Sequence, residues 1–212
     1  MYKILALNCL VSAYMMSALF LRGLKQGDTQ MTASGLVVAA LFFLLSQAKP
    51  LQALSARRPA SSVFAPSVAL SILGQFTVHL SSLFAVLYLC ELHDPTLASS
   101  SSILADGRFQ PNLINSAVFL LSAVMQVNNF VVNYRGNPFT QGLTENLPLL
   151  RTVQGLYGGL LLAVGGGLEP LNDLLQLAPF PGKEFQAQLL AVLLLNCAAT
   201  WAMEKFCQTF EK

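Results

Sequence analysis

The sequence has 212 residues, of which 54% are hydrophobic and only 10% are charged. Because ordinary soluble domains carry about 25% charged residues, this composition favours a protein embedded in a lipid bilayer. The formal net charge is only +2, and no Lys/Arg cluster is interleaved with aromatic residues, so the sequence lacks the electrostatic signature of a nucleic-acid-binding protein.

The apolar residues are gathered in long windows, and a transmembrane helix needs about 20 of them. The first window follows Lys3 and could also be interpreted as a signal peptide, but its length and the Arg22 and Lys25 behind it favour a retained helix. The fifth window is the shortest and ends in three consecutive glycines. The predicted spans are about 4–21, 29–48, 66–90, 111–134, 148–168 and 184–206.

These windows predict an all-α membrane protein, a bundle of about six transmembrane helices that forms a single domain over residues 1–212. Lys and Arg are retained on the cytoplasmic side of a membrane, and with six spans the connecting segments alternate between the two sides. One side carries Lys3, Lys49, Arg57, Arg58, Arg135, Arg151, Lys205 and Lys212. The other carries Arg22, Lys25, Arg108 and Lys183. The imbalance predicts that both termini are cytoplasmic and that the acidic face, with Asp28 and Glu169, is lumenal.

Polar side chains occur within several of these windows. No charged residue lies deep within the five clearest windows, so ion coordination by this chain alone is not expected. The amides and the histidine could line a polar groove, although hydrogen bonding between helices is the more common role. The candidates for helix packing or a polar network are Gln75, His79, Asn115, Gln126, Asn129 and the G-x-x-x-G pair Gly155 and Gly159.

Motifs that carry chemistry are not found in the sequence. It contains no Walker sequence, no dinucleotide-binding glycine pattern and no metalloprotease pattern. The four cysteines form no C-x-x-C pair, so neither a disulfide framework nor a zinc site is expected. We therefore predict no catalytic, cofactor-binding or metal-binding residues in this chain.

Several stretches nevertheless resemble a known family. They are MYKILALNCLVSAYMMSALFLRGLKQGDTQ (1–30), SQAKPLQALSARRP (46–59), FTVHLSSLFAVLY (76–88), FQPNLINSAVFLLSAVMQ (109–126) and NYRGNPFTQGLTEN (133–146). In this order they resemble the C-terminal membrane half, helices five to ten, of the class V, A-branch P-type ATPases of the endoplasmic reticulum. The resemblance weakens after Leu147, and Met15 and Met16 stand where the family usually has polar residues.

The resemblance implies a multi-pass protein of the endoplasmic reticulum membrane. Its parent would be an ATP-driven pump, using ATP and Mg²⁺, that extracts or translocates transmembrane helices of misinserted or tail-anchored proteins. The implied partners are the lipid bilayer, the remaining ATPase helices and cytoplasmic head, and the transmembrane-helix substrates. P-type ATPases phosphorylate the aspartate of an Asp-Lys-Thr-Gly sequence in that head. Since this sequence has no such motif, the chain alone is not expected to hydrolyse ATP, and a fragment or truncated gene is the simplest explanation.

Family helices five and six flank the substrate route, and the resemblance therefore makes Asn8, Tyr14, Asp28 and Gln30 candidates for lining the groove. The alternative for these residues is structural, with Asn8 and Tyr14 packing in the bundle and Asp28 capping the second helix. The alternative for the whole chain is a stand-alone six-helix membrane binding or scaffold protein without ATPase activity.

Overall fold

The protein is described by a computed structural model that covers residues 1–53, 62, 64–94 and 109–210. The predicted basic residues Arg57, Arg58, Arg108 and Lys212 lie outside this part of the chain. The helices are α1 (Tyr2–Leu21), α2 (Asp28–Ser46), α3 (Pro66–His93), α4 (Leu113–Asn133), α5 (Leu147–Val164), α6 (Glu169–Leu174) and α7 (Lys183–Gln208).

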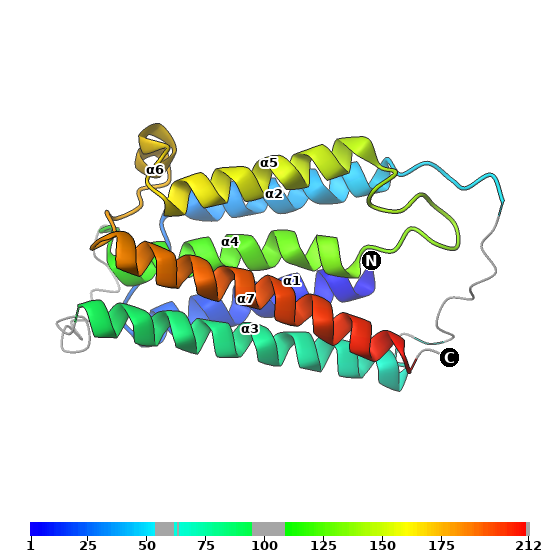
Figure 1. The fold of residues 1–212 in the computed structure, drawn as a ribbon, viewed down its shortest axis with the longest axis horizontal. Helices are drawn as coiled ribbons and strands as arrows, with labels where there is room; N and C mark the ends of the chain where they lie inside the picture. Colours follow the sequence, from blue (N-terminus) through cyan, green and yellow to red (C-terminus); the bar gives the residue numbers. More distant parts are fainter. Residues whose placement is uncertain (54–61, 63, 95–108, 211–212) are drawn as a thin grey trace.

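Within the described ranges, six helices are long and apolar enough to cross a membrane, and only the short α6 is not. This confirms the predicted all-α bundle of about six transmembrane helices. Successive long helices run up and down, so both chain termini lie at the same end of the bundle (Figure 1). We refer to this as the terminal end, and its position on the cytoplasmic side stays a prediction.

Helix α4 is the centre of the bundle. All but two of its 21 residues are buried, whereas the other long helices keep one face exposed. Helices α1, α3 and α7 lie on one side of α4, and α2 and α5 pair on the other (Figure 1). The main apolar core joins α1, α3, α4 and α7. A second core, around Ile4, Leu41 and Phe130, joins α2 and α5 to α4 and α1 toward the terminal end.

Local sequence signals explain where several helices begin. Pro66 is the first residue of α3, where its missing N–H costs no helical hydrogen bond. The Asn112 side chain accepts a 2.7 Å hydrogen bond from the Asn115 N–H and caps α4. Asn146 caps α5 in the same way and also donates to the Leu44 carbonyl of α2. That second bond ties the start of α5 to the end of α2.

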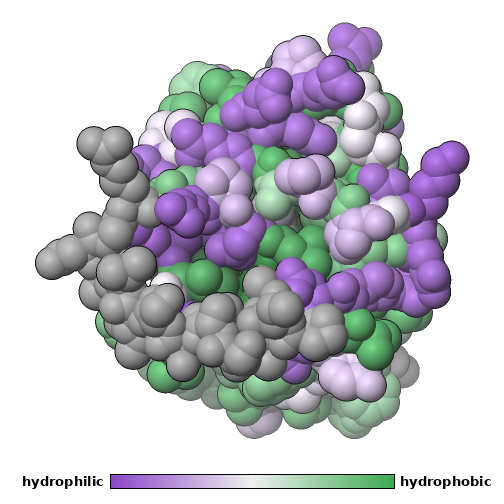
Figure 2. All heavy atoms as spheres, turned by 90° about the vertical axis from the view of Figure 1, so that its left-hand side faces the viewer, coloured by the Kyte–Doolittle hydropathy of each residue, from purple (hydrophilic) through white to green (hydrophobic). Residues whose placement is uncertain are grey.

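The opposite end of the bundle carries α6 and the turn between α1 and α2. Helix α5 ends at Val164, because Gly166 turns the chain with a φ of +71° that favours glycine. The fifth helix is thus shorter than the predicted span 148–168. Figure 2 looks onto this end, where hydrophilic residues spread across a largely apolar bundle. The exposed charged residues there include Asp28, Glu169, Asp173, Lys183 and Glu184.

The pairing of α3 with α7 is the most extensive helix contact and depends on Gly74. A Cβ atom added to Gly74 would lie 2.0 Å from Met203 Cε and 2.9 Å from its Cγ. We expect Gly74→Ala to destabilise the protein by about 1–3 kcal/mol through overpacking, measured as a fall in the thermal midpoint in detergent micelles. Gly35→Ala is the matched control, because no atom lies within 4 Å of its Cβ position. Adding Met203→Ala to Gly74→Ala should recover part of the loss. A Gly74→Ala variant that is as stable as Gly35→Ala would contradict this account.

Candidate functional site

A chain of hydrogen-bonded polar side chains crosses the main core. The His79 ring lies at its middle and is fully buried. Its Nε2 is 3.0 Å from Asn129 Oδ1, and its Nδ1 is 3.1 Å from Asn196 Nδ2. Asn129 Nδ2 in turn donates to Asn8 Oδ1 at 3.1 Å. The contacts join α1, α3, α4 and α7, and because polar groups in hydrocarbon need internal partners, they fix how these four helices fit together.

The same series of hydrogen-bonded side chains reaches a buried carboxylate toward the terminal end of the bundle. Glu204 on α7 is only 1% exposed. It accepts hydrogen bonds from Lys3 Nζ (2.7 Å), Ser71 Oγ (2.5 Å) and Gln75 Nε2 (3.0 Å), and it is also paired with Arg135. One carboxylate thus joins α1, α3, α7 and the segment after α4.

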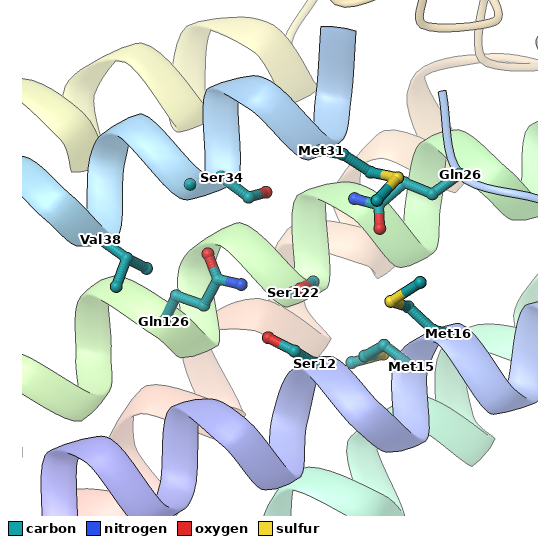
Figure 3. Close-up of a pocket in the computed structure, with 10 residues that line it drawn as sticks. Ser12, Met15, Met16, Gln26, Met31, Ser34, Val38, Ser122 and Gln126 are labelled. Carbon is teal, nitrogen blue, oxygen red and sulfur yellow. The ribbon is translucent and has the colours of Figure 1, made fainter. Parts of the chain in front are cut away.

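A groove lies on the other side of α1, between α1 and α2, with α4 at its base. Its volume is about 280 Å³. Figure 3 shows Ser12 of α1, Ser34 of α2, and Ser122 and Gln126 of α4 around it, with Met15, Met16 and Met31 further along. Hydroxyl and amide groups therefore line one part of the groove, and flexible methionines line the part next to it.

Gln126 is one of two deeply buried polar residues of the groove, together with Ser122. Its side chain is 5% exposed, and its Oε1 has no hydrogen-bond partner among the described residues. Ser34 Oγ on α2 is likewise buried and unpartnered in this part of the chain. Since an unpaired polar group in an apolar environment is costly, a side-chain rotation that turns either atom into the groove would let a bound group satisfy it.

A smaller apolar pocket of about 190 Å³ lies between α2, α4 and α5, and it shares the lining residues Ser34 and Gln126 with the groove. Gly155 and Gly159 line it, and no atom of the described chain lies within 4 Å of a Cβ built on either glycine. The G-x-x-x-G pair therefore faces a space within the described part of the chain, and its predicted role in close helix packing stays a prediction.

The polar residues chosen from the sequence are divided between these features. Gln75, His79 and Asn129 belong to the buried hydrogen-bond chain, and Gln126 lines the groove. Asn115 is separate from both, because it accepts from Gln30 Nε2 at 3.0 Å and donates to the Lys25 carbonyl at 2.8 Å. It therefore fixes the turn between α1 and α2.

The four candidates carried over from the family resemblance lie around the groove but do not line it. Asn8 is bonded to Asn129, and Gln30 is fully buried and bonded to Asn115 and the Leu175 carbonyl. Tyr14 packs edge-on against Phe76. Asp28 is exposed at the start of α2, where it lies beyond the groove-lining Gln26.

Two features of the site were missed from the sequence. Glu204 was not singled out, because it lies next to the end of an apolar window, and only the fold shows that it is buried. Ser12 and Ser122 were not singled out either, since single serines in transmembrane windows are common. Their significance depends on the meeting of α1 and α4 beneath the groove.

No family model matches the sequence. The endoplasmic reticulum transmembrane helix translocase of Schizosaccharomyces pombe is 38% identical over 217 residues, covering 99% of this chain and 17% of the relative. The protein of the same name in Saccharomyces cerevisiae is 36% identical over 213 residues, with 99% and 17% covered. Nearly the whole chain is therefore homologous to one segment of these translocases.

A plant relative carries a different name. The probable manganese-transporting ATPase PDR2 of Arabidopsis thaliana is 42% identical over 181 residues, covering 85% of this chain and 15% of that protein. The chain thus spans only 15% to 17% of the length of these translocase-family relatives. The collinear resemblance drawn from residues 1–146 is confirmed by these alignments.

Two of the segments that resemble the translocase family lie against each other at the terminal end. The Leu51 N–H donates to the Phe139 carbonyl at 3.0 Å, and the Gln141 N–H donates to the Lys49 carbonyl at 2.9 Å. The segment after α2 and the segment after α4 are therefore paired through backbone hydrogen bonds, which gives these loops a fixed place in the fold.

Proposed function

We propose that this chain is the C-terminal membrane part of a helix-translocating P-type ATPase of the endoplasmic reticulum, and that the groove between α1 and α2 forms part of its substrate surface. The observation that carries the proposal is the groove itself. Serine and glutamine side chains line it, and most of them come from the membrane-spanning helices α1, α2 and α4. Two of the polar atoms there, Ser34 Oγ and Gln126 Oε1, have no partner among the described residues, and a bound side chain would satisfy them.

The size of the groove sets how a substrate would be held. A transmembrane helix with its side chains is about 10 Å wide, so a space of about 280 Å³ accommodates side chains from one face of it. The substrate helix would lie alongside α1 and α2 and insert a few residues between them. Methionines suit this role, because their flexible side chains adapt to different partners.

The carried-over candidates have supporting parts in this proposal. Asp28 lies exposed beyond one end of the groove, where its carboxylate would attract basic residues that flank a substrate helix. Asn8, Tyr14 and Gln30 would not contact the substrate but would hold α1 and α2 against α4. The groove stays open only as long as these two helices keep their separation.

ATP and Mg²⁺ are assigned to the parent and not to this chain. The 212 residues contain no Asp-Lys-Thr-Gly sequence, and the described helices offer no nucleotide-binding loop of the Walker type. The residues present therefore do not fit a nucleotide, and no step of ATP hydrolysis is derived from them. The helices and head that would supply it lie outside this chain.

Site-specific photo-crosslinking tests the proposed groove. A photoreactive amino acid is placed at Met16 or Met31, which line the groove and are each 46% exposed, in the 212-residue chain in nanodiscs. A fluorescent transmembrane-helix peptide is then added. We expect peptide adducts from both positions, because both face the bound helix.

The matched control positions are Phe84 on α3 and Leu195 on α7. They are 63% and 68% exposed but lie outside the groove, so they should give no more adduct than random encounters in the bilayer. Equal yields from all four positions would overturn the groove assignment. That result would favour the stand-alone scaffold as the function of the chain.

A further inference from the structure

The amide group of Gln126 has unused hydrogen-bonding capacity at a defined depth in the membrane. Its Oε1 has no partner among the described residues, and its side chain lines the groove. Gln126 lies seven residues before Asn133, the last residue of α4, which corresponds to about 10 Å along the helix axis. An unpaired amide at this depth is the kind of intramembrane polar group that points to a ligand.

The chemistry of a primary amide defines what would bind to it. A carboxamide both accepts and donates hydrogen bonds, so its best partner also does both. The bundle already contains such a pair, in which Gln75 Nε2 donates to Asn133 Oδ1 at 3.0 Å and Asn133 Nδ2 donates to Gln75 Oε1 at 2.9 Å. An amide on an incoming helix could form the same reciprocal pair with Gln126.

The groups around Gln126 favour the same partner. Ser12 and Ser122 contribute hydroxyl groups to the groove, and Figure 3 shows Ser12 and Gln126 extending toward one another from α1 and α4. None of the groove-lining residues is charged, so a fully ionised side chain would find no counter-charge there. Neutral donors and acceptors are matched best.

We propose that Gln126 is a specificity-determining residue that selects transmembrane helices carrying an amide or hydroxyl side chain about 10 Å from the terminal end of the bundle. The inference rests on the proposed function, since it concerns the same groove. It adds the chemical class of the substrate side chain that is recognised and the depth of that side chain in the membrane. The existence of the groove alone specifies neither.

A competition experiment in nanodiscs tests this selectivity. A fluorescent reference helix is crosslinked from a photoreactive residue at Met16, and two unlabelled leucine-rich helices compete for it. One helix carries a single Asn at the depth of Gln126, and the other carries Leu at that position. We expect the Asn helix to compete about three- to tenfold better, the range for one to two interhelical hydrogen bonds. With Gln126→Leu, this ratio should fall to about one.

The chain offers a matched control in Gln154. It lies seven residues from the start of α5 at the same end of the bundle, but it is exposed and outside the groove. Gln154→Leu should therefore keep the ratio. Moving the Asn of the competitor to the opposite end of the helix should abolish it.

The outcomes separate the two proposals. A reference helix that gives no adduct above that from Phe84 overturns the proposed function and this inference together. A reference helix that is captured, but with equal competition by the Asn and Leu helices, overturns only the selectivity. The same applies if the ratio survives Gln126→Leu or is independent of the position of the Asn.

Discussion

Replacing Glu204 by leucine is expected to lower the free energy of unfolding by about 2–3 kcal/mol. Breaking a buried ion pair typically costs about 3–5 kcal/mol, but the Lys3 and Arg135 side chains are 15% and 31% exposed, and solvent would relieve part of their loss. Gln75 Nε2 and Ser71 Oγ would also lose an acceptor. The measurement is thermal unfolding in detergent micelles followed by circular dichroism, with a fall in Tm of about 5–10 °C.

Glu184 provides the control for this substitution. It lies on the same helix but is exposed, and its carboxylate accepts a long hydrogen bond of 3.4 Å from Gln188. Glu184→Leu should change the free energy of unfolding by less than about 0.5 kcal/mol. If Glu204→Leu proved as harmless as Glu184→Leu, the carboxylate would not be joining α1 to α3 and α7.

Asn129→Leu is expected to cost about 2–3 kcal/mol through a different mechanism. The substitution keeps the volume of the side chain but removes the acceptor for His79 Nε2 and the donor to Asn8 Oδ1. Each buried group left without a partner costs about 1–3 kcal/mol. This cost exceeds the average of about 0.6 kcal/mol for an interhelical hydrogen bond, because His79 and Asn8 are both buried. Chemical unfolding of the purified chain gives the comparison.

Gln154→Leu is the matched control for Asn129→Leu. It also replaces an amide by leucine within a transmembrane helix, but Gln154 is exposed on α5. We expect no loss of stability, since an exposed amide gains little in lipid. A loss as large as that of Asn129→Leu would show that hydrophobic substitution itself, and not the broken hydrogen bonds, harms the protein.

Glu204→Leu and Asn129→Leu also test whether the buried core fixes the position of α1 beside the groove. Glu204 and Asn129 belong to the assembly of α1, α3, α4 and α7, whereas the groove lies between α1 and α2. If α1 is fixed by Glu204 and Asn129, both variants should also loosen the groove wall that α1 provides. The photo-crosslinking yield from Met16 should then fall in each of them.

The sequence by itself determined the class of the fold, the number of spans and the family. These depend on local properties of the sequence. Apolar windows are long enough to cross a bilayer, and successive stretches such as residues 1–30 resemble segments of a known family in the same order. A membrane span is defined by transfer of its own residues into lipid, so it can be predicted without knowing its neighbours.

Only the tertiary structure decided which polar residues act together. His79 and Asn129 are 50 residues apart and Lys3 and Glu204 are 201 apart, and no periodicity in the sequence relates such pairs. The structure also placed Gly155 and Gly159 beside a space and showed that Gln126 faces the groove. Helical spacing predicts which residues share a face of one helix. Whether that face meets another helix, lipid or a cavity depends on how all the helices pack, and this physical information is distributed over the whole chain.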